Sequence, residues 1–182
     1  MNAIDIMMEE HRYISRMLEV IKKACFKIYK NKFIDYDDFR NIILFIREYA
    51  DAHHHKKEEI LLFSKMVEHI GNVAEKTINH GMLVEHDMGR MYITGLEEAL
   101  KKSEKGDEKA ILDIIANAIS YTHLLERHID KENNVIYKFG QKYLSEEVLK
   151  IIDEECISFE NDNLAISEKN IKLLELLEKK YL

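Results

Sequence analysis

Apolar residues recur every three or four positions along almost the whole chain, and this is the period of an amphipathic α-helix. The pattern predicts five helices, at about residues 3–30, 35–69, 73–103, 107–139 and 146–181. Asp35 or Asp37 is suited to cap the second helix and Asp107 the fourth, because a side-chain oxygen before a helix accepts a free backbone N–H. The fifth helix is expected to break near residues 161–163 (Asn-Asp-Asn), whose side chains compete for backbone hydrogen bonds.

Long helices joined by short loops become antiparallel neighbours, so the predicted fold class is all-α. Residues 1–140 are expected to form an up-down-up-down four-helix bundle, and residues 141–182 an additional C-terminal helix. This extension must bury its apolar stripe either against the bundle or in a partner subunit, so a homodimer through the C-terminal helix is one of two alternatives. The chain has no proline and six glycines, which suits uninterrupted helices.

Composition narrows the class of protein. The formal net charge of −7 over 182 residues argues against nucleic acid as a partner, because phosphate binding needs a basic face. The first residues lack the basic and apolar regions of a signal peptide, and no apolar run approaches the roughly 20 residues of a membrane helix. Cys25 and Cys156 are isolated, so reduced thiols are expected. We therefore expect a cytoplasmic protein with no membrane and no nucleic-acid partner.

The chain carries one pattern of candidate metal ligands twice. In each copy a lone histidine, preceded by Glu10 or Glu85, is followed at a nearly equal offset by a His-x-x-x-Glu pair. Residues four apart on an α-helix differ by about 40° around the axis, so each pair points a nitrogen and a carboxylate at the same place. The six candidate metal ligands are His11, His54, Glu58, His86, His128 and Glu132.

Two glutamates that face each other in a core are costly unless a cation lies between them. Two octahedral ions offer about 12 coordination positions, of which four histidines fill about four and two bridging glutamates about four more. An oxo or hydroxo bridge takes about two, which leaves about two for solvent or a small ligand. The pattern therefore predicts a carboxylate-bridged pair of metal ions with positions open to oxygen, peroxide or nitric oxide.

Several neighbouring residues keep two interpretations. His55 and Glu59 repeat the spacing of His54 and Glu58, but the apolar residues that follow match the second copy only in the His54–Glu58 register. His55 and Glu59 are therefore expected to flank the ligands. His123 lies off the ligand face of its helix, and Tyr121 lies on the ligand side, either as a hydrogen-bond donor to the site or as part of the core.

Three further residues have structural alternatives. Gly89, one turn after His86, either lets two helices approach closely or keeps a path open to the metal ions. His69 and His80 lie off the ligand faces and are expected to be hydrogen-bonded core residues.

At these residues the chain resembles the hemerythrin-like, or HHE cation-binding, family. The matching stretches are HHKKEEILLF at 54–63, EHDMGR at 85–90 and HIDKENN at 128–134, and with His11 they cover about residues 5–140. The resemblance implies a four-helix bundle with a non-haem, carboxylate-bridged di-iron centre, ligated by the six candidate residues.

The chain departs from the oxygen-carrying hemerythrins at two places. Those proteins have a second histidine in the third helix, where this chain has Met82, and an aspartate five residues after the histidine of the fourth helix. Here Glu132 follows His128 at four residues. One histidine fewer favours a more reactive or more weakly held metal pair over simple oxygen carriage, unless another residue such as His123 or Tyr121 fills that position.

The resemblance supports more than one function. A di-iron protein that binds or reacts with oxygen, peroxide or nitric oxide in stress defence or sensing, as a candidate oxidoreductase, is the first hypothesis. A reversible oxygen store or sensor without turnover, and an iron-donating or iron–sulfur repair protein, are alternatives. A structural zinc or manganese site is a further one, because ligand type alone does not select a metal.

Overall fold

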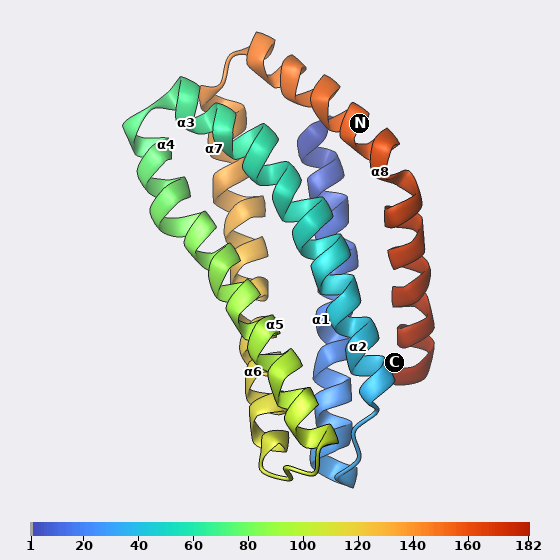
Figure 1. Cartoon of the computed structure of the whole chain (residues 1–182). Helices are drawn as coiled ribbons and strands as arrows, with labels where there is room; N and C mark the ends of the chain where they lie inside the picture. The colour runs from blue at the N-terminus through green and yellow to red at the C-terminus, as the bar shows by residue number, and fades with distance from the viewer. Residues whose placement is uncertain (1) are drawn as a thin grey trace.

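The computed structural model describes residues 2–182, which form five helical rods joined by short turns (Figure 1). Several rods change between α-helical and π-helical geometry (η) without a break. In chain order the rods are α1 (Ala3–Asn31); α2 (Tyr36–Phe45), η1 (Ile46–His55), η2 (Glu58–Phe63) and α3 (Ser64–Ile70); α4 (Asn72–Thr77), η3 (Ile78–Met82) and α5 (Leu83–Glu104); α6 (Ala110–Lys131), η4 (Glu132–Ile136) and α7 (Tyr137–Tyr143); and α8 (Glu146–Tyr181). The predicted all-α fold with five helices is confirmed.

Side-chain caps set most of the helix starts. Asp35 accepts a hydrogen bond from the backbone N–H of Asp38 at 3.2 Å, which resolves the alternative between Asp35 and Asp37. Asp107 accepts from the N–H of Lys109 at 3.0 Å, but α6 begins only at Ala110, so the predicted start of this helix is wrong by three residues. The intervening residues form a turn instead.

Four of the rods pack as a bundle whose interior is divided into two apolar clusters. One cluster contains Ile21, Ile42 and Ile114, and the other contains Met7 and Leu62. Between them lies a layer of buried histidines and glutamates. In a close-packed helical core, polar side chains at one level must satisfy one another or bind a cation.

The helix α8 runs along the outside of the bundle, beside α1 and the second rod (Figure 1). It buries Ile152, Cys156, Leu174 and Leu177 against the bundle of its own chain. The predicted break at residues 161–163 is wrong: the helix is continuous there, because Asn163 donates its side-chain N–H to the Phe159 carbonyl one turn earlier, at 2.8 Å.

Two of the remaining histidines and both cysteines lie outside the polar layer. His69, in the last turn of α3, and His80, in η3, are exposed, so the prediction that they are core residues is wrong. Cys25 and Cys156 are buried and form no disulfide within residues 2–182. In the same described part of the chain, no helix is both long and apolar enough to cross a membrane.

Candidate metal centre

The polar layer between the two apolar clusters contains all six predicted ligands. None is more than 2% exposed: His11, His54, Glu58, His86, His128 and Glu132. The structure therefore brings residues of four different rods to one place. We call His11 and His54 the first histidine pair, and His86 and His128 the second.

In each of these four histidines the ring nitrogen Nδ1 meets an acceptor outside the centre. The four distances are 2.8 Å from His54 to Glu10, 2.8 Å from His128 to Glu85, 2.7 Å from His86 to Glu59 and 2.8 Å from His11 to the Asn133 side-chain oxygen. Ionised carboxylates and amide oxygens only accept hydrogen bonds, so Nδ1 carries the proton and donates. In the neutral ring, Nε2 then presents a lone pair to the centre.

These outer partners repeat together with the ligands. The residue before each lone histidine, Glu10 or Glu85, holds the other histidine of the same pair. The residue after each ligand glutamate, Glu59 or Asn133, holds the lone histidine of the opposite pair. The two copies of the motif therefore hold each other in place.

The Nε2 atoms of each pair are spaced as ligands of one ion. They lie 2.8 Å apart in the first pair and 3.0 Å apart in the second. Two nitrogens bound about 2.1 Å from one ion, at right angles, are about 3.0 Å apart. Two facing lone pairs at this distance repel each other, and a cation between them removes the repulsion.

The two ligand glutamates lie between the histidine pairs. Glu132 approaches both pairs, with Oε2 at 3.2 Å from Nε2 of His11 and Oε1 at 3.0 Å from Nε2 of His128. Oε2 of Glu58 lies 3.5 Å and 3.6 Å from one Nε2 of each pair. Among residues 2–182, this oxygen and both oxygens of Glu132 have no hydrogen-bond partner. Unpaired buried carboxylate oxygens between two imidazole pairs fit two bridged cations.

His55 joins the second histidine pair. Its ring stacks on that of His86, with centroids 3.9 Å apart, and within residues 2–182 neither of its nitrogens has a hydrogen-bond partner. Two groups of buried donor atoms each fit within 4.8 Å: His11, His54, Glu58 and Glu132, and His55, Glu58, His86 and His128.

The sequence interpretation of His55 as a flanking residue assumed one direction from the helix to the centre. Consecutive residues point about 100° apart, and the helix carrying His54 and His55 faces both halves of the centre, so each residue can serve one half. This rod is π-helical up to His55 and again from Glu58, and the fourth rod is π-helical from Glu132. Such wide turns occur often at functional sites and have no simple sequence signal.

The electrostatics of the centre also favour a cation. Burial and the charge of Glu132 raise the pKa of Glu58. Burial and the neighbouring His11 lower the pKa of His54 to about 4, which keeps its lone pair free at neutral pH. Against the effect of burial, the charge of Glu132 raises the pKa of His128 to about 9, so a proton fills the place of a cation between them.

A proton donor lies on the first half of the centre. The Tyr137 hydroxyl donates a hydrogen bond to Oε1 of Glu58 and lies 3.4 Å from Nε2 of His11. Its pKa is raised by burial and by the charge of Glu58, so the hydroxyl keeps its proton. Sequence reasoning missed this role, because a tyrosine in an apolar run is usually a core residue.

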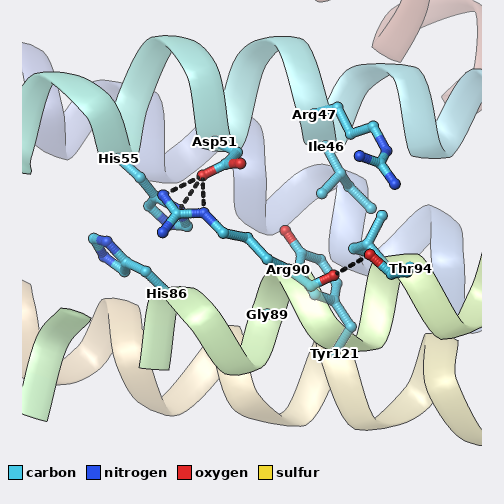
Figure 2. Close-up of a pocket in the computed structure, with 10 residues that line it drawn as sticks. Ile46, Arg47, Asp51, His55, His86, Gly89, Arg90, Thr94 and Tyr121 are labelled. Carbon is cyan, nitrogen blue, oxygen red and sulfur yellow. Dashed lines mark hydrogen bonds and ion pairs between the residues drawn. The ribbon is translucent and has the colours of Figure 1, made fainter. Parts of the chain in front are cut away.

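A cavity of about 190 Å³ lies beside the second half of the centre (Figure 2). His55 and His86 line one end, and the Tyr121 hydroxyl, which has no partner within residues 2–182, is buried in its wall. Gly89 also lines it, and a methyl group there would meet the Tyr121 ring only at an ordinary 3.6 Å. Close helix packing therefore does not require a glycine at this position.

Arg90 closes one side of this cavity. Figure 2 shows its side chain reaching from α5 toward Asp51 on the facing rod, beside His55. It donates to Asp51 at 2.7 and 2.9 Å and to Glu59 at 2.9 Å. His123, the other residue considered for the site, is exposed and lies outside both donor groups.

The fold and the site together define a helical bundle with a buried histidine–carboxylate centre suited to hold metal ions. A family model described as the Hemerythrin HHE cation binding domain matches residues 2–139, and the chain belongs to this family. The resemblance inferred from the motifs is thereby confirmed. The comparisons with curated proteins and with solved structures give no match. The helix α8 lies beyond the matched residues.

Proposed function

We propose that the protein binds two iron ions, one in each donor group, bridged by Glu58 and Glu132. The observation that carries this proposal is the repeated pair of Nε2 atoms about 3 Å apart, each ring held from behind through Nδ1. A structural zinc site is a weaker interpretation, because such a site is usually closed by four ligands around one ion.

His55 changes the count of open positions. Five imidazoles, two bridging carboxylates and an oxo or hydroxo bridge would occupy about 11 of about 12 octahedral positions, which leaves about one for a small ligand. His55 thus supplies the imidazole that the oxygen-carrying hemerythrins have in the third helix at the position of Met82. The first half has one imidazole fewer than the second, so a small ligand has more room there.

We infer that this site binds or reacts with oxygen, peroxide or nitric oxide. Two bound iron ions supply the electrons and the Lewis acidity that such chemistry needs. Tyr137 holds a proton beside Glu58 and His11, where a developing negative charge would need it. The apolar clusters above and below keep bulk water away, and the cavity beside His55 offers a route for small molecules.

The test is rapid mixing of anaerobic, iron(II)-loaded protein with oxygen, peroxide or nitric oxide in separate experiments. The proposal predicts an absorbance change with at least one of them that is faster than with equimolar free iron(II). Repeated turnover with peroxide or nitric oxide would identify an oxidoreductase, and reversible binding a store or sensor. Rates equal to those of free iron with all three reagents would contradict the proposal.

Iron donation is the second candidate function, since the Glu132-Asn133-Asn134 segment resembles that of iron–sulfur repair proteins. In the structure Asn133 already has a role in the centre, because it accepts the hydrogen bond from His11. This contact supports iron that is retained. Iron lost to a chelator within seconds would favour donation instead. A cytoplasmic location and a homodimer through α8 stay predictions, and light scattering tests the latter.

A further inference from the structure

Behind the candidate ligands, each half of the centre has a row of three hydrogen-bonded residues: a lysine, a glutamate and a histidine. In each half the residue before the ligand glutamate is a lysine that donates to the glutamate holding a histidine through Nδ1. The rows are Lys57–Glu10–His54 in the first half and Lys131–Glu85–His128 in the second. The repeat predicts equal support for both halves.

Within residues 2–182, the helix α8 contacts only one of these two rows, so their surroundings differ. Glu160, from the middle of α8, accepts a hydrogen bond from Lys57 and lies 3.3 Å from Nε2 of His53. The side chain of Lys57 is 0% exposed, whereas that of Lys131 is 41% exposed. Among the described residues, Lys131 has Glu85 as its ion-pair partner and no carboxylate from α8.

The cluster behind the first half already contains its cation. Glu10, His53 and Glu160 are close enough to hold an ion, but the Lys57 ammonium pairs with both carboxylates. His53 lies 3.1 Å from Glu10 and so joins the two carboxylates from the other side. The cluster is therefore a closed charge network rather than a third metal site.

We propose that Glu160 of α8 is a positioning residue for the metal centre, acting through Lys57 and Glu10 on His54. This inference rests on the proposed two-metal site. Glu160 shares the positive charge of Lys57 and so leaves more negative charge on Glu10, which strengthens its hydrogen bond to the His54 ring. The C-terminal helix thus supports the first half of the centre, although it lies outside the family domain.

The experiment measures iron release to a colorimetric iron(II) chelator from anaerobic, iron-loaded full-length protein. Glu160→Gln is expected to release one of two ions on the order of 3- to 10-fold faster and to leave the other unchanged. Removing a direct outer partner of a ligand costs on the order of 10- to 100-fold, so Glu10→Gln is expected to act more strongly. In the double variant the Glu160→Gln substitution should add nothing, because it acts through Glu10.

Glu178→Gln is the matched control. It also removes a carboxylate of α8, one that pairs with Arg16 at 2.6 and 2.8 Å, but 18 residues and about 27 Å further along the helix. It is expected to lower the stability of the metal-free protein slightly and to leave both release rates unchanged.

Two results would overturn the inference: release from Glu160→Gln at the wild-type rate, or the same acceleration in Glu178→Gln. Acceleration of both ions together would also overturn it, because that is the result of a general loosening of the fold. Failure of the proposed function is a separate result, seen as wild-type protein that takes up no iron.

Discussion

At the scale of single residues, the centre-facing nitrogen of each histidine in the two pairs is made available by a hydrogen bond on the far side of its ring. Glu10, Glu59 and Glu85 fix the tautomer of three histidines, and they stay ionised while doing so. The hydrogen bond from His128 lowers the pKa of Glu85 to about 2, and that from His86 lowers the pKa of Glu59. Inside the centre, Oε2 of Glu58 and both oxygens of Glu132 have no such donor among residues 2–182, and this favours a bound cation.

Glu58→Gln is expected to stabilise the metal-free protein at pH 7 by about 1–3 kcal/mol, because a buried carboxylate with one oxygen unpaired, beside the charge of Glu132, is costly. The folded-state pKa of Glu58 is raised. The contribution of its protonated form to stability is therefore fully present below the unfolded pKa of 4.5 and is lost as the pH rises. The gain in the variant should therefore disappear when the pH is lowered to about 4. Urea denaturation at several pH values measures it.

Glu59→Gln is the control, because its effect on the free energy of unfolding at pH 7 is expected to have the opposite sign. The pKa of Glu59 is lowered in the folded state, so its contribution is present above pH 4.5 and is lost as the pH falls. This variant should be less stable than wild type at pH 7. Equal effects of the two substitutions would contradict the assignment of Glu58 to the centre and Glu59 to its outside.

His55→Ala is expected to weaken binding of one iron ion by on the order of 100-fold. Loss of a residue that only holds a ligand costs on the order of 10- to 100-fold, and His55 is proposed to bind the ion directly. The other ion should be held nearly as in wild type. Competition titration with a chelator measures both affinities, and His123→Ala, which changes an exposed histidine, is the control. Unchanged affinities in His55→Ala would show that His55 only packs against His86.

At the scale of helices, the recurrence of apolar residues every three or four positions was sufficient to predict five helices, each with both boundaries within four residues of the structure. It could not predict the π-helical turns around His55, Glu58 and Glu132, because they depend on ligand positions in other rods. It also could not show that Asn163 stays within α8, since its competing hydrogen bond is satisfied inside the helix. The repeated spacing was sufficient to pick out the six candidate ligands that the structure brings together, whereas His55, directly beside His54, has no spacing signal of its own.

The packing of α8 on the bundle gives a prediction at this scale. Leu174 is completely buried at the interface with the bundle, whereas Leu176 is 64% exposed. Leu174→Ala should lower the free energy of unfolding by about 2–5 kcal/mol, as loss of a buried leucine does. Leu176→Ala should change it by less than about 0.5 kcal/mol. Urea denaturation distinguishes the two, and equal values would contradict the packing of α8 on its own chain.

At the scale of the whole molecule, the bundle is two apolar clusters joined through a polar layer that is incomplete without cations. The apolar clusters hold the rods in register, and the register brings two copies of one motif face to face. Composition and motifs could predict this arrangement because the histidine–glutamate motif occurs twice in the sequence. The support that Glu160 brings from α8 could not be predicted, because a single glutamate on a charged helix has no distinguishing spacing.

The measurement that tests this account most directly is anaerobic titration of the metal-free protein with iron(II), followed by iron analysis and an absorption spectrum after oxidation. The account predicts two iron ions per chain and an absorption band that appears on oxidation. Saturation at one ion, no uptake of iron, or a single tightly bound zinc in its place would contradict it.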